Sequence, residues 1–125
     1  GISGQILSEL TKDLDVETAD SGWTIRIPGS IIFAKDSYQI KPDAVKFLKK
    51  IALLIWKMRG EVRIVGYTDA TEKNKWWLSI KRASSVLMAL LKEKKIDPAR
   101  VTIMGYADTR SPGRKVEIFL EKRST

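Results

Sequence analysis

Hydrophobic and polar residues follow two different periods along the chain, and these periods predict where helices and strands form. Apolar residues recur at helical spacing in three segments, residues 3–14, 42–58 and 75–94. Alternating or short continuous apolar runs predict five strands, at residues 15–20, 23–27, 61–66, 101–106 and 114–121. Turn-forming residues such as Gly22 and Gly60 lie between these runs.

The order of these segments predicts the fold. A short N-terminal helix is followed by the order β-β-α-β-α-β-β. Helices that alternate with strands are typical of an α/β (α+β) two-layer sandwich, so we expect a mixed sheet with the helices on one face. The two β-α-β connections are expected to be right-handed.

Composition narrows the range of functions. The chain has 125 residues, of which 43% are hydrophobic, so one domain with a substantial core is expected. It contains no cysteine and no histidine. Disulfides and thiol chemistry are therefore excluded, and the commonest general base and metal ligand are missing. We expect no cofactor and no metal site.

The net charge of +8 is the second constraint. A basic surface attracts polyanions such as nucleic acid, anionic lipid or an acidic cell-wall polymer, although it also serves solubility alone. The longest uninterrupted apolar run, residues 51–56, is far shorter than the roughly 20 residues of a membrane-spanning helix. The N-terminus does not resemble a signal peptide, so a cytoplasmic protein or an excised soluble domain is expected.

The segment GYTDATEKNKWWLSIKRA, residues 66–83, holds the candidate chemistry. Asp69 follows a predicted strand at the sheet edge where open α/β sheets bind ligands. Arg82 lies on the helix that follows. The two side chains form either a salt bridge or solvated surface charges, or they border one cleft. In a cleft, the carboxylate suits an ammonium and the arginine fork suits a carboxylate, so together they would hold a zwitterion.

A helical wheel of residues 75–94 assigns faces to the aromatic residues. It places Trp76 on the core stripe, with Ile80 and Ala83. Trp77 falls at the edge of the polar face and is either a packing residue or a partner contact. Arg82 falls beside the core stripe, and its guanidinium is expected to point outward while its stem lies on aliphatic neighbours.

Five motifs identify the chain as similar to a known family. IIFAKDSYQIKPDAVKFLKKIALLI, GYTD, LSIKRASSV, DPARVTIMGYAD and GRKVEIFL occur in the order and spacing of the OmpA-like peptidoglycan-binding domain. The resemblance covers roughly residues 16–121. It implies non-catalytic binding of cell-wall peptidoglycan through the diaminopimelate of the stem peptide.

The resemblance also implies the site residues. The residues predicted to bind peptidoglycan are Asp69, Arg82, Thr68, Leu78, Ser79 and Arg114. Tyr67 and Trp77 are candidate contacts for a ligand or partner. The chain departs from the family pattern at Tyr67, where histidine is usual, at Lys75 and Gly113, where asparagine is usual, and in a shorter loop between Asp69 and Arg82.

Within the family, the chain most resembles the periplasmic C-terminal domain of MotB-type flagellar stator proteins. That resemblance implies residues 1–15 as a helix or linker from an absent membrane anchor and residues 16–125 as the wall-binding domain. It further implies a homodimer, a MotA-type membrane partner, and a location in the periplasm as the soluble part of an inner-membrane protein. An envelope tether of the Pal or OmpA type is the alternative.

Two other classes compete with wall binding. An enzyme is not expected, because Ser79 has no histidine to activate it and the chain carries no metal-ligand cluster or glycine-rich phosphate-binding loop. A nucleic-acid-binding module agrees with the charge. However, no helix carries a dense basic stripe and the strands lack the aromatic pair that stacks RNA bases, so no nucleic-acid partner is expected.

Overall fold

Five strands and their connecting helices make up the computed structural model, which describes residues 2–123. The elements in chain order are α1 (Ile2–Asp13), β1 (Asp15–Ala19), β2 (Gly22–Ile27), α2 (Gly29–Ile32), α3 (Pro42–Lys57), β3 (Val62–Gly66), α4 (Lys75–Glu93), the 3-10 turn η1 (Pro98–Arg100), β4 (Val101–Gly105) and β5 (Val116–Glu121).

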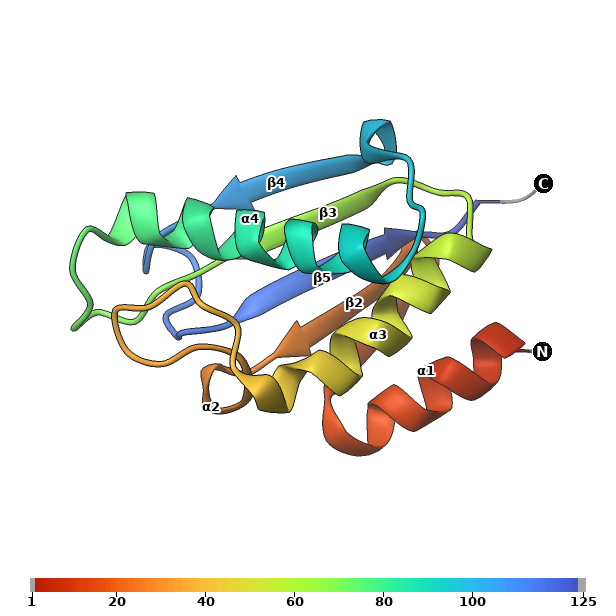
Figure 1. Ribbon diagram of the computed structural model, residues 1–125, viewed down its shortest axis with the longest axis horizontal. Coiled ribbons are helices and arrows are strands. Elements are labelled where there is room, and N and C mark those ends of the chain that lie inside the picture. Colours follow the sequence, from red (N-terminus) through yellow and green to blue (C-terminus); the bar gives the residue numbers. More distant parts are fainter. Residues whose placement is uncertain (1, 124–125) are drawn as a thin grey trace.

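The strands form one sheet in the order β1-β2-β5-β3-β4. The β3–β4 pair is parallel and the other pairs are antiparallel. Helices α1, α3 and α4 cover the same face of this sheet (Figure 1). The predicted mixed two-layer sandwich is thus confirmed, and the inserted four-residue helix α2 is an addition to the predicted order.

The core lies between the sheet and the helices because the strands alternate. In β5, Val116, Ile118 and Leu120 are buried while the residues between them are partly exposed. Helix α3 begins at Pro42, whose missing N–H costs nothing in the first turn of a helix. Its inward face, like that of the strands, is apolar.

Helix α1 is packed onto this core. Ile6, Leu10 and Leu14 are buried in the same hydrophobic cluster as the residues of α3. The N-terminal segment therefore contributes to the packing of the domain, whereas the division of the chain at residue 15 stays a prediction.

Helix α4 approaches the sheet very closely at one point. Gly66 of β3 and Gly105 of β4 are paired in parallel register, and both face α4 at Ser79. A Cβ on Gly105 would lie 2.5 Å from the Ser79 hydroxyl oxygen and 2.6 Å from the Ile80 nitrogen. The absence of side chains at these two glycines lets the helix settle against the strands.

The prediction that Trp76 faces the core is wrong. Its side chain is 56% exposed. The first turn of α4 extends past the ends of β3 and β4, so no strand lies beneath it (Figure 1). The face of α4 that is buried contains Leu78, Arg82 and Val86. Of the two residues that the wheel grouped with Trp76, Ile80 is also exposed, whereas Ala83 is buried as expected.

Candidate functional site

The predicted site residues come from three elements that meet at the C-terminal ends of β3 and β4. Thr68 and Asp69 follow β3, while Arg114 precedes β5. The structure brings Asp69 and Arg114 together, with 3.6 Å between an Asp69 carboxylate oxygen and the Arg114 Nε. Their side chains are 32% and 35% exposed, so both are accessible to a ligand.

Arg82 is placed differently from its prediction. Its side chain is fully buried, so the expectation of an outward guanidinium is wrong. Arg82 lies on the same inward face of α4 as Leu78 and Val86. Burial is tolerated because the guanidinium donates to the Glu72 carboxylate and to the backbone carbonyl oxygens of Ala34, Ser37 and Tyr67.

Glu72 is the residue that the sequence reasoning missed. Its two carboxylate oxygens lie 2.7 and 2.5 Å from the Arg82 Nη atoms and also accept the backbone N–H groups of Asp69 and Asp36, at 3.0 and 2.7 Å. Burial raises the pKa of Glu72, but these donors outweigh burial and hold that pKa below its usual range. The available signal was an acidic residue in the loop ahead of a helical arginine.

Asp69 remains an accessible anion at the edge of the site. Its carboxylate accepts hydrogen bonds from the Thr71 hydroxyl at 2.6 Å and the Thr71 N–H at 2.8 Å. The hydroxyl bond is the largest cause of its lowered pKa, and the positive charges of Arg114 and Lys35 contribute. Asp69 is therefore ionised at neutral pH and suits an ammonium group.

Three other predicted residues are buried behind Asp69. Thr68 is fully buried, and its hydroxyl has no hydrogen-bond partner within residues 2–123. Leu78 packs inward from α4. The Ser79 hydroxyl donates to the Trp76 carbonyl at 2.9 Å and accepts the Ala107 N–H at 3.0 Å. These groups hold the loops that follow β3 and β4 against α4.

The two candidate contact residues differ in access. Tyr67 is nearly buried, and its hydroxyl donates to Glu117 at 2.5 Å. Burial and this bond raise the pKa of Tyr67 above its ordinary value. Trp77 is 53% exposed and packs edge-to-face with Tyr38, with ring centroids 5.7 Å apart. Only Trp77 of the two thus presents substantial surface to a ligand.

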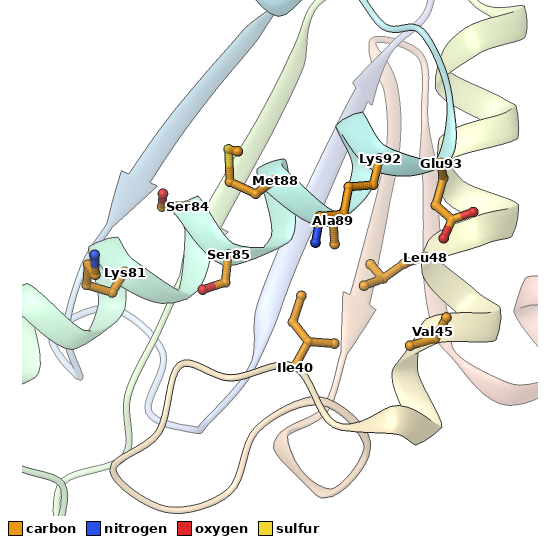
Figure 2. A pocket seen from close by; sticks show the side chains of 10 residues that line it. All are labelled: Ile40, Val45, Leu48, Lys81, Ser84, Ser85, Met88, Ala89, Lys92 and Glu93. Atoms are coloured by element: carbon orange, nitrogen blue, oxygen red, sulfur yellow. The ribbon is translucent and has the colours of Figure 1, made fainter.

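A separate groove lies between α3 and α4. It has a volume of about 490 Å³. The side chains that line it are Ile40, Val45, Leu48, Lys81, Ser84, Ser85, Met88, Ala89, Lys92 and Glu93 (Figure 2). None of the predicted peptidoglycan-binding residues lines this groove, so it is a different feature from the Asp69 site.

Neither a metal-ion site nor a membrane-spanning helix is found in the described part of the chain. Among residues 2–123, no three His, Cys, Asp or Glu side chains converge in a way that could hold a metal ion. Within the same residues, no helix is both long enough and apolar enough to cross a bilayer.

A mixed five-stranded sheet with helices on one face defines the class of two-layer α/β domains. Within that class, the chain belongs to the OmpA family, whose sequence model matches residues 32–117. The match covers more than half of the chain and confirms the family resemblance.

Solved structures share this fold. The cell wall anchor of the T6SS from Pseudomonas aeruginosa has a TM-score of 0.82 and 26% identity, with 96% of each chain covered. The periplasmic domain of Helicobacter pylori MotB has a TM-score of 0.76 and 23% identity, covering 88% of this chain and 89% of that chain. The second likeness shows the fold alone.

A curated relative extends the likeness to motility proteins. Motility protein B of Bacillus subtilis is 26% identical over 133 residues, which covers 92% of this chain and 51% of the relative. The chain thus spans about half the length of that protein.

Proposed function

We propose that this domain binds peptidoglycan, with Asp69 as the contact for the ammonium group of the stem-peptide diaminopimelate. The observation that carries the proposal is an ionised, solvent-facing carboxylate at the C-terminal end of β3, beside Arg114. Membership of the OmpA family and the fold shared with a cell wall anchor support it.

The other predicted residues have different roles in this proposal. Arg114 is the accessible arginine and offers its guanidinium to a carboxylate of the ligand. Arg82 fixes the loop that carries Asp69, because it joins Glu72 to the carbonyl oxygen of Tyr67. Thr68, Leu78 and Ser79 are supporting residues, since all three are buried.

The proposed activity is binding without catalysis. The chain has no histidine, and the Ser79 hydroxyl is engaged in packing α4 against the loop after β4. A reaction would require a base to remove the hydroxyl proton, and no group of that kind contacts Ser79 in residues 2–123.

At the level of the cell, we infer an anchor that connects a membrane complex to the wall. The likeness to Motility protein B supports a flagellar stator of the MotB type. In that role the domain would lie in the periplasm as part of an inner-membrane protein, form a homodimer, and act with a MotA-type partner. These assignments rest on the relatives.

A pull-down on purified sacculi tests the wall-binding proposal. Asp69→Asn removes the exposed charge and is expected to weaken binding about tenfold, the value of one charge-assisted hydrogen bond. Asp20→Asn is the matched control because it makes the same charge change in the exposed β1–β2 turn, at the opposite end of the sheet. Equal binding by the two folded variants would contradict the proposed site.

A further inference from the structure

The Arg82 guanidinium has no donor to spare for a ligand. Its Nε–H is bound by the Ser37 carbonyl at 2.8 Å. One Nη is bound by the Tyr67 carbonyl and by Glu72, and the other by the Ala34 carbonyl and by Glu72. An arginine has five N–H groups, and five acceptor contacts are present. No stem peptide reaches this group unless a bond to Glu72 breaks.

The Glu72 carboxylate is held as a bound ligand would be held. It forms a two-point contact with the Arg82 fork, and each oxygen also accepts one backbone N–H, from Asp69 or Asp36. Neither side chain of the ion pair is exposed to solvent. This geometry is that of a preformed carboxylate site with its occupant in place.

We propose that Glu72 is an intramolecular carboxylate ligand of Arg82, and that it determines specificity by removing the need for a free carboxylate on the diaminopimelate. This inference rests on the proposed wall-binding function. The site then binds the ammonium group of the ligand through Asp69 and binds a carboxylate of the ligand only weakly.

Glu72 competes for Arg82 more effectively than a dissolved carboxylate does, because both residues belong to the same chain. Ten positions separate it from Arg82, and a carboxylate on a short tether has an effective concentration in the millimolar range or above. A free peptide at micromolar concentration therefore does not displace it. The N–H of Asp69 also donates to Glu72, so the same contact holds the Asp69 loop in its binding conformation.

Hydrogen bonds also join the two loops beside the Glu72–Arg82 ion pair. Asp36 accepts the Lys73 N–H at 2.9 Å and donates its own N–H to Glu72, which ties residues 34–41 to residues 67–74. These two loops lie side by side at one end of the molecule (Figure 1). The only described cation that contacts Asp69 is Arg114, and it is partly exposed and screened by solvent.

The test uses two tripeptide probes from the stem peptide, one with free diaminopimelate and one in which its side-chain carboxyl is an amide. Calorimetric titration of the wild-type domain is expected to give dissociation constants within about threefold of each other. Glu72→Gln keeps the shape and removes the charge. It is expected to favour the free carboxylate at least about tenfold, because Arg82 then lacks its charged partner and a ligand carboxylate can displace the neutral amide.

Glu17→Gln is the matched control, since Glu17 of β1 is also paired with an arginine, Arg26 of β2, but at the edge of the sheet away from β3. It is expected to behave as the wild type. A second measurement needs no variant: the NMR signal of the Arg82 Nε–H, which is bound to Ser37, is expected to stay fixed when the wild type is saturated with either probe.

Three outcomes would contradict the inference. The first is a wild type that prefers the free carboxylate by tenfold or more. The second is movement of the Arg82 signal on binding. The third is a folded Glu72→Gln variant that keeps the wild-type ratio. Each of these leaves wall binding intact, whereas failure of both probes and of sacculi to bind any of the proteins would overturn the proposed function itself.

Discussion

Asp69 and Glu72 are carboxylates three positions apart that occupy opposite environments. Asp69 is partly exposed and receives its main hydrogen bonds from Thr71. Glu72 is buried and receives four donors, two of them from Arg82. A buried ion pair adds little net stability compared with apolar side chains, but losing one partner leaves a costly buried charge. Glu72 therefore holds Arg82 in place, and Asp69 is the carboxylate that we propose for binding.

The Glu72–Arg82 pair predicts how stability depends on pH. The pKa of Glu72 is lower in the folded protein than the roughly 4.3 of an unfolded chain. The ionised Glu72 carboxylate therefore contributes its full stabilisation to the folded protein above the unfolded-state pKa. This stabilisation is lost as the pH falls through the lowered folded-state pKa. At pH 7, Glu72→Gln is expected to reduce the free energy of unfolding by about 3 kcal/mol.

Urea unfolding at a series of pH values measures this difference. The gap between wild type and variant is expected to shrink as the pH is lowered toward about 3, because the wild-type carboxylate is then increasingly protonated. A gap that stays constant from neutral to acidic pH would show that the charge of Glu72 does not contribute in the way described.

At the scale of elements, two glycines determine where α4 lies and hence where Arg82 points. Gly66 faces the Ser79 carbonyl oxygen, and Gly105 faces the Ser79 hydroxyl and the backbone of Ile80. An added methyl group at either position would push the helix away from the sheet. The position of the helix follows from close backbone packing more than from the apolar pattern of its surface.

Alanine substitutions test this packing. Gly66→Ala and Gly105→Ala are each expected to lower the free energy of unfolding by about 2 kcal/mol or more, through overpacking. Gly4→Ala is the control, because a Cβ there meets nothing within 4 Å and α1 gains helix propensity, worth about 0.5–1 kcal/mol. Thermal unfolding of the three variants would refute the close approach if Gly66→Ala were as stable as wild type.

The sequence predicted the elements and the sheet better than it predicted the site. Period-two and period-3.6 patterns report which face of an element is apolar, and that was enough for the core strands and for α3. Helix α4 has apolar residues on two faces, so the pattern could not choose between Trp76 and Leu78. The Glu72–Arg82 contact depends on the loop conformation, which no periodicity encodes.

At the scale of the whole molecule, the net charge of +8 adds a nonspecific attraction to any polyanion. This term is long-ranged and is screened by salt, whereas the local contacts of Asp69 are less affected. Binding of Asp69→Asn to sacculi is expected to disappear as salt is raised to about 0.5 M, while the wild type retains binding. Duplex DNA, measured in parallel, is expected to release both proteins at the same salt concentration.

A common salt response of wild type and Asp69→Asn on sacculi would mean that charge alone accounts for wall binding. Retention of DNA at high salt would favour a nucleic-acid-binding module instead. Either result would remove the specific role assigned to Asp69, and the two results are distinguishable in one titration series.

The most direct measurement is NMR mapping of the diaminopimelate tripeptide on the wild-type domain. We expect saturable backbone shifts concentrated at Thr68, Asp69 and Thr71 and at Arg114, with little change in the groove between α3 and α4. Shifts that map to that groove, or a peptide that causes no saturable shift while the domain remains folded, would contradict binding at Asp69.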